Sequence, residues 1–184
     1  MEKNINDIFL LYEEFGNFDY IGEPVSQLEH MVQAAMQAEE DSQSYEIIFA
    51  ALFHDIGHLV ALKYKKDKNE LGAKNHEDVG YNFLTEKQVP SPIPFLARSH
   101  VLAKRYLVSK NKDYYNLLSD SSKKTLIEQG KTLSEKECIN LENHIYFKDI
   151  IKLRRYDDNA KKVDITIKPI SYYKDLYIKY LKYK

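Results

Sequence analysis

A histidine and an aspartate stand side by side, at His54 and Asp55, inside the apolar stretch 47–62. Burying an imidazole and a carboxylate without partners costs several kcal/mol, so buried groups of this kind are usually paired or bound to a metal. If the stretch is helical, His58 lies one turn after His54, on the same face. The pair therefore predicts a metal site in the core, with further ligands elsewhere in the chain.

Helical periodicity dominates the rest of the sequence, and capping boxes stand at Ser26 with Glu29 and at Ser134 with Glu137. Residues 65–75 are charged and predict a solvated loop, whereas 163–167 alternate like a short strand or an extended link. We expect helices over residues 4–15, 27–39, 45–64, 76–87, 94–109, 113–118, 123–129, 134–143, 146–162 and 171–183. The pattern predicts a single all-α domain over residues 1–184.

The composition limits which cellular compartment and which binding partners we expect. The 27 basic residues balance 28 acidic ones, which gives no electrostatic case for nucleic acid or an acidic membrane surface. The longest apolar stretch is interrupted by His54, Asp55 and His58, so we do not expect it to span a bilayer. The N-terminal residues do not have the pattern of a secretory signal. Cys138 is the only cysteine, which excludes an intrachain disulfide and a zinc-thiolate site. We expect a cytoplasmic protein, with a homodimer possible.

Further metal ligands are expected on other helices, because His30, His54, His76 and His100 each fall on a different one. A single histidine in such a context is usually a hydrogen-bonded core or surface residue. Here we favour metal ligands instead, because the His54-Asp55 pair has helix-borne histidines both before and after it. Imidazole and carboxylate together suit iron, manganese or zinc, and an aspartate beside a histidine can bridge two metals.

This ligand order, closed by the late aspartate Asp157 in Arg154-Arg155-Tyr156-Asp157, resembles the HD-domain superfamily. The PhnZ/TmpB-like oxygenases of that superfamily are more closely similar, over segments 20–35, 76–84, 100–107, 118–122 and 153–158. The similar core spans about residues 18–160, and a C-terminal accessory helix (169–184) lies outside it. The resemblance implies a helical bundle around a dinuclear site with two iron ions (Fe2+/Fe3+). With O2 as co-substrate, such a site would cleave the C–P bond of a small 1-hydroxyphosphonate and release phosphate.

The same resemblance implies a role for each residue of the site. One iron would be held by His30, His54, Asp55 and Asp157, with Asp157 preferred to Asp158 by motif alignment. Asp55 would bridge to a second iron held by His76 and His100. The implied substrate contacts are Tyr20, Glu23, His58, Lys104, Ser122 and Arg154, and the first four of these are the implied catalytic residues.

Two of these residues, Tyr20 and Glu23, would close over the site on a loop. Tyr20 would cap the open iron position, and Glu23 would meet the amino end of a substrate. For Lys104 and Arg154 the alternative is a surface ion pair. We favour the functional interpretation for His58 and Lys104, and weigh the two equally for Ser122 and Arg154.

Other functions use the same ligands. A metal-dependent HD phosphohydrolase would attack a phosphate ester or nucleotide with metal-bound hydroxide. A sensor that binds a phosphonate or nucleotide without turnover is the weaker alternative, because the ligand set is complete. Tyr20 and Glu23 favour the oxygenase, since a hydrolase has no need of a tyrosine that caps iron. Amino, trimethylammonio and bare hydroxymethyl phosphonates all remain candidate substrates.

Overall fold

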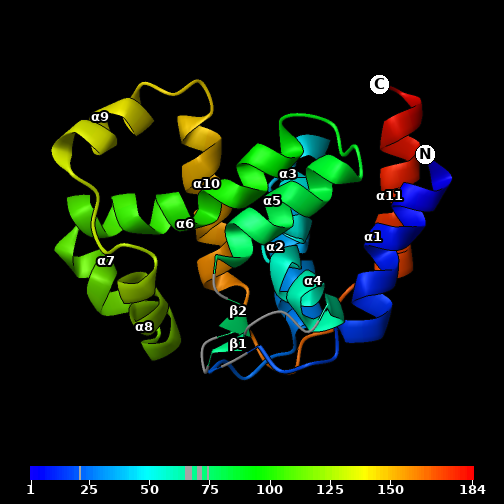
Figure 1. The fold of residues 1–184 in the computed structure, drawn as a ribbon, viewed down its shortest axis with the longest axis horizontal. Helices are drawn as coiled ribbons and strands as arrows, with labels where there is room; N and C mark the ends of the chain where they lie inside the picture. The colour runs from blue at the N-terminus through cyan, green and yellow to red at the C-terminus, as the bar shows by residue number, and fades with distance from the viewer. Residues whose placement is uncertain (21, 65–67, 70–71, 74) are drawn as a thin grey trace.

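Helices make up nearly all the regular structure of the computed structural model, which describes residues 1–20, 22–64, 68–69, 72–73 and 75–184. They are α1 (Glu2–Phe15), α2 (Gln27–Glu40), α3 (Tyr45–Phe53), α4 (Ile56–Tyr64), α5 (His76–Glu86), α6 (Ile93–Lys110), α7 (Lys112–Leu117), α8 (Asp120–Glu128), α9 (Glu135–Glu142), α10 (Phe147–Asn159) and α11 (Ile170–Lys182) (Figure 1). The prediction of an all-α fold is confirmed.

The segment 65–75, predicted as a loop, carries a short antiparallel hairpin of β1 (Lys68–Asn69) and β2 (Gly72–Ala73). Residues 65–67, 70–71 and 74 of that prediction lie outside the described part of the chain. The other segment with strand-like alternation, residues 163–167, forms no strand; it bends at residues 163–164 and links α10 to α11.

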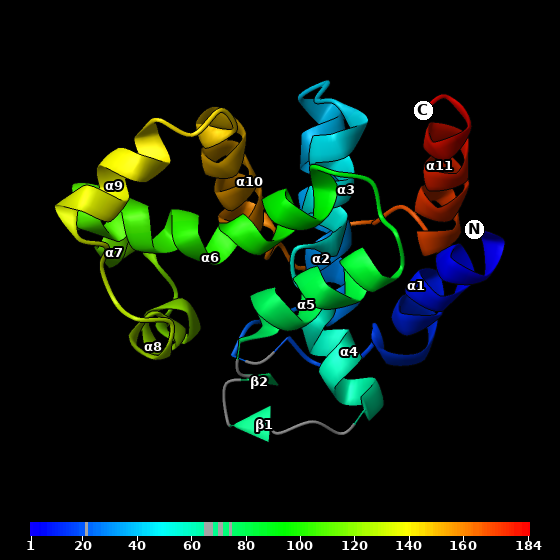
Figure 2. The same cartoon turned by 45° about the horizontal axis from the view of Figure 1, so that its top comes forward.

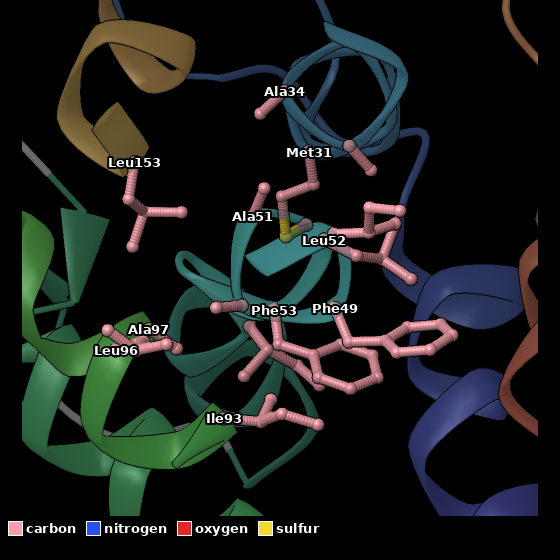
Figure 3. Packing of buried hydrophobic residues seen from close by; sticks show 14 of the residues in the cluster. Met31, Ala34, Phe49, Ala51, Leu52, Phe53, Ile93, Leu96, Ala97 and Leu153 are labelled. Atoms are coloured by element: carbon pink, nitrogen blue, oxygen red, sulfur yellow. The ribbon is translucent and has the colours of Figure 1, made fainter. Parts of the chain in front are cut away.

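Helix α3 is the centre of the core, because its apolar residues face every direction and everything from Ile47 to Phe53 is buried. Helices α2, α6 and α10 pack around it. Figure 3 shows side chains of these four helices meeting between the ribbons: Met31 and Ala34 from α2, Phe49, Ala51, Leu52 and Phe53 from α3, Ile93, Leu96 and Ala97 from α6, and Leu153 from α10. The helices that carry the expected ligands are thus fixed by one shared core.

The single helix predicted over 45–64 is wrong. The chain forms two helices there, α3 and α4, bent by 41° at His54-Asp55. The Nδ1 atom of His54 lies 2.8 Å from the carbonyl oxygen of Ala51, a local side-chain bond of the kind that competes with regular helix bonding. Uniform apolarity on both sides hid the break from the sequence pattern. Because the helices bend at the His-Asp pair, both side chains lie at an inner corner of the fold.

Helices α4 and α5 touch through their backbones at Gly57. A Cβ atom there would lie 1.9 Å from the carbonyl oxygen of His76 and 2.9 Å from the backbone nitrogen of Gly80. Glycine is therefore required by this close approach. The contact sets the position of His76, the first residue of α5.

The C-terminal helix completes the core instead of extending from it. Helices α11 and α1 lie side by side, at the opposite end of the molecule from α7, α8 and α9 (Figures 1 and 2). Tyr173, Tyr177 and Tyr180 are buried, and the ring of Tyr177 packs edge-on against Phe49 at 4.9 Å. By length and composition, no single helix in the described residues could cross a membrane; only α3 and α4 together, across their bend, meet that test.

Candidate metal centre

The six predicted metal ligands lie together at the inner corner made by the α3–α4 bend. The bend itself supplies His54 and Asp55, and the others come from four further helices. They are His30 on α2, His76 on α5, His100 on α6 and Asp157 on α10. Each of the six residues is at most 7% exposed, so their polar atoms face one another and not bulk water.

The first donor group consists of His30, His54, Asp157 and one oxygen of Asp55. The Nε2 atoms of His30 and His54 are 3.0 Å apart. Asp55 Oδ2 lies 3.6 Å from the first of them and 3.5 Å from the second. Asp157 Oδ1 lies 3.4 Å and 3.7 Å from the same two nitrogens. Two nitrogens and two carboxylate oxygens thus point at one small volume.

The second donor group uses the other oxygen of Asp55. The Nε2 atoms of His76 and His100 are 3.0 Å apart, and each lies 3.3 Å from Asp55 Oδ1. Asp55 therefore presents one oxygen to each group, which is the arrangement of a carboxylate that bridges two metal ions. The second group has fewer protein donors than the first.

Hydrogen bonds at the Nδ1 atom, on the side of the ring away from the cluster, place a proton on three of the histidines. Nδ1 of His30, His54 and His100 lies within 3.0 Å of a backbone carbonyl oxygen, that of Ala160, Ala51 and Ala97 respectively. Since a carbonyl only accepts, each Nδ1 carries a proton, and Nε2 is the ring nitrogen that faces inward. Such backbone partners are usual for metal-bound histidines.

The donor set fits a metal ion. Two Nε2 atoms 3.0 Å apart, as in His30 and His54, need a proton or a metal ion between them, because their lone pairs would otherwise repel each other. Metal–ligand bonds of about 2.1 Å place neighbouring donors of an octahedral ion about 3.0 Å apart. Imidazole and carboxylate without thiolate is a donor set for iron, manganese or zinc.

The pKa values of the cluster also favour a bound cation. Burial opposes it, but the charges of Asp55 and Asp157 raise the pKa of His54 to about 9. The pKa of Asp55 is held well below its usual range despite burial, through the charge of His54 and hydrogen bonds from His100 and His76. A site with this preference for positive charge exchanges protons for a metal ion when it is loaded.

Arg154 supports the ligand Asp157 from behind. Its guanidinium donates to Asp157 Oδ2 at 2.7 Å, to Asp158 Oδ1, and to the hydroxyl of Tyr114 at 2.9 Å. Tyr114 in turn donates to Asp158 Oδ2 at 2.6 Å. Asp157 is therefore the aspartate that faces the histidines, whereas Asp158 belongs to the supporting network. Arg154 is only 3% exposed, so the alternative of a surface ion pair is wrong.

A small cavity adjoins the second donor group. Its volume is about 40 Å³, and its lining residues include Asp55, His76 and His100 on the metal side and Tyr20, Gln27, His58, Lys104, Ser121, Ser122, Thr125 and Arg154 around them. The cavity is thus lined both by metal donors and by two buried basic side chains, Lys104 and Arg154. This arrangement suits a small anion that also reaches the metal ions.

Burial tunes two of the side chains that line the cavity. Lys104 is 3% exposed and donates to Thr125 Oγ1 at 2.9 Å, and burial together with the charge of Arg154 lowers its pKa to about 7. The ring of His58 stacks on His76 at 4.1 Å. Burial and the charge of His76 lower the pKa of His58 to about 3, so its imidazole is neutral at pH 7.

The two loop residues predicted to cover the site take different positions. The ring of Tyr20 stacks on that of His30 at 4.1 Å and lines the cavity, and burial and the charge of Asp55 raise its pKa well above the usual range. Glu23 is not among the residues that line the cavity. Its Oε1 atom accepts hydrogen bonds from Lys161 at 2.6 Å and from Ser119 at 2.5 Å.

Sequence reasoning missed three residues of this region: Tyr114, Thr125 and Lys161. Lys161 follows Asp157 by four residues, but α10 ends at Asn159 and not at 162 as predicted, so helical spacing gave no guide to its place. Thr125 lies on α8, which begins at Asp120 because the Ser119 hydroxyl caps it. No sequence signal marks Tyr114.

The chain is similar in sequence to a known domain family and to several known proteins. The model of the HD domain matches residues 28–146. Uncharacterized protein L432 of Acanthamoeba polyphaga mimivirus is 45% identical over 180 residues, covering 97% of this chain and 82% of that protein. [1-hydroxy-2-(trimethylamino)ethyl]phosphonate dioxygenase (glycine-betaine-forming) of Leisingera caerulea is 37% identical over 84% of this chain and 79% of its own. Hydroxymethylphosphonate dioxygenase of Gimesia maris is 36% identical over 93% and 85%.

Proposed function

Since the chain belongs to the HD-domain family, we propose that it is a diiron oxygenase that uses O2 to cleave the C–P bond of a small 1-hydroxyphosphonate and releases phosphate. One observation carries the proposal. Two relatives, similar over 84% and 93% of this chain, bear the names of dioxygenases that act on hydroxyphosphonates. The arrangement of Asp55 between two donor groups supports it independently, because a shared carboxylate suits a coupled metal pair.

The residues that would hold the irons follow from the two donor groups. His30, His54, Asp55 and Asp157 would hold one ion, and Asp55, His76 and His100 the other. The donor group of Asp55, His76 and His100 lines the cavity and offers fewer protein ligands than the other, which would leave room for substrate and O2 at an ion held there. When bound as an Fe2+/Fe3+ pair, the metals would supply O2 activation and accept the substrate oxygens.

The protein itself would bind and orient the phosphonate. Lys104 and Arg154 supply positive charge against its oxygens, while His58 and Ser122 supply hydrogen bonds. The buried walls exclude bulk water, which strengthens these interactions. A volume of 40 Å³ holds about one or two water molecules and not a phosphonate, so Tyr20 would have to move aside when substrate enters.

The lowered pKa of Lys104 predicts a pH dependence. A protonated Lys104 is needed for phosphonate binding, and with a pKa of about 7 in the free enzyme it loses its proton above neutrality. We expect kcat/KM to fall above pH 7 by up to about tenfold per pH unit. In Lys104→Met we expect kcat/KM to be about 100-fold lower at pH 6.5 and to lack this fall.

Stopped-assay pH profiles of the two proteins test this prediction. Ionisation of the substrate affects wild type and Lys104→Met equally. The difference between their two pH profiles therefore reports the ionisation of Lys104 alone. Lys112→Met, at an exposed position on α7, is the matched control and should follow the wild type. A wild-type profile parallel to that of Lys104→Met would contradict the role of Lys104.

The function is tested by following O2 uptake and phosphate release together. Protein loaded with iron and given hydroxymethylphosphonate is expected to release one phosphate for each O2 consumed, and none under argon. A parallel assay offers phosphate monoesters and nucleotides without O2. Phosphate release from those esters, with no O2-dependent release from the phosphonate, would show a phosphohydrolase and overturn the proposal.

A further inference from the structure

The charged residues around the cavity limit which substituents a substrate can have in addition to its phosphonate group. Resting on the proposed function, we infer that the substrate has no cationic substituent, and that Lys161 is the residue that sets this preference. The two named relatives do not decide the point, because one name contains a trimethylamino group, the other contains none, and their identities to this chain are 37% and 36%.

Each carboxylate that lines the inner or the outer cavity, and Glu23 beside Lys161, already has a partner among the described residues. Asp55 and Asp157 face the Nε2 atom of the metal-site histidine His30. Asp158 accepts from Arg154 and Tyr114. Glu23, whose side chain is 7% exposed, accepts from Lys161 at 2.6 Å. An ammonium group on the substrate would therefore find no carboxylate that is free to receive it.

Lys161 is held firmly in this position. Its side chain is 16% exposed, and its Nζ lies 3.3 Å from Ser119 Oγ and 3.5 Å from Ser122 Oγ besides its bond to Glu23. The same ammonium lies 5.9 Å from the centre of the Tyr20 ring. Lys161 thus joins the segment that carries Tyr20 and Glu23 to the start of α8, which carries Ser122.

Lys161 also lines a second cavity. That outer cavity has a volume of about 500 Å³ and is lined by Tyr114, Leu117, Leu118, Ser119, Arg155, Asp158, Asn159 and Lys161. The Lys161 ammonium, which lines this outer cavity, lies 5.9 Å from the ring centre of Tyr20, which lines the inner cavity. A substituent that extends from the inner cavity past Tyr20 would therefore come close to this ammonium.

A cationic substituent at this place is disfavoured by charge. To use Glu23 it would share one carboxylate with Lys161, which puts two positive charges within about 4–5 Å of each other in a partly buried site. A substrate with an uncharged substituent, or with hydrogen alone as in hydroxymethylphosphonate, meets no such repulsion. Like-charge opposition of this kind is a common source of specificity.

The test compares hydroxymethylphosphonate with [1-hydroxy-2-(trimethylamino)ethyl]phosphonate in four iron-loaded proteins: wild type, Lys161→Met, Lys161→Arg and the matched control Lys162→Met, whose side chain is exposed. The readouts are kcat/KM from O2-dependent phosphate release and Kd from calorimetric titration under argon. We expect the wild type to prefer hydroxymethylphosphonate by at least about tenfold in both. Lys161→Met should lower that ratio at least about tenfold, whereas the arginine and control variants should keep it.

A wild-type preference for the trimethylamino substrate would overturn the inference, as would an unchanged ratio in Lys161→Met. Should Lys161→Met fail to fold, Lys161→Gln takes its place with the same expectation. If neither compound is turned over, the proposed reaction fails, while the Kd values still report on the role of Lys161. A charge preference in Kd that depends on Lys161 would then support the inference, and no binding of either compound would sink both.

Discussion

Replacing Asp55 by asparagine is expected to remove at least one metal ion per chain and to lower kcat/KM by more than about 1,000-fold. Each oxygen of Asp55 faces a different pair of histidines, at 3.3 to 3.6 Å from their Nε2 atoms. An asparagine has the same shape, but it carries no charge and has only one oxygen, so it can serve one donor group at most. The loss would therefore come from the bridge itself and not from a change in packing.

Metal content by mass spectrometry and activity, measured on the same protein samples, check this prediction. The matched control is Asp164→Asn, at an exposed position where the backbone is left-handed (φ of 56°) and asparagine is well tolerated. It should keep full metal content and activity. An Asp55→Asn protein that retains two ions per chain would contradict the bridging role.

Gly57→Ala is expected to lower the free energy of unfolding by more than about 4 kcal/mol. The added Cβ would stand 1.9 Å from the carbonyl oxygen of His76 and 2.7 Å from its carbonyl carbon. Both are backbone atoms, so no rotamer change can relieve the overlap and α5 must move away from α4. Because His76 begins α5, the second donor group would lose one of its nitrogens as well.

Denaturant titration measures the stability of this variant, and metal analysis measures its site. Lys63→Ala, on a partly exposed position of the same helix, serves as control and should change stability by less than about 0.5 kcal/mol. A Gly57→Ala protein with wild-type stability and full metal content would show that α4 and α5 need not touch.

Local sequence signals predicted most of the helices, and they predicted that the six expected metal donors would lie together. Capping boxes at Ser26 and Ser134 mark the starts of α2 and α9, because their bonds involve only residues three positions apart. The donors were recognisable because buried imidazole and carboxylate need partners, so their presence in apolar helices is itself a signal. The structure brings all six into one cluster.

Features that depend on contacts between distant segments escaped prediction. The bend at His54-Asp55 lies in a uniformly apolar stretch with no proline at the break, so periodicity continued through it. The bond between Glu23 and Lys161 joins residues 138 positions apart. It pairs Glu23, the residue expected to meet the amino end of a substrate, with a lysine. Position along the chain carries no information about such a pair.

Electron paramagnetic resonance of the iron-loaded protein tests the central claim most directly, that Asp55 couples two irons beside a phosphonate-binding cavity. A mixed-valent Fe2+/Fe3+ pair has an odd number of electrons and gives a signal at low temperature. We predict such a signal in the wild type, shifted by hydroxymethylphosphonate and absent in Asp55→Asn. A spectrum with isolated Fe3+ alone, unchanged by the phosphonate, would contradict the account.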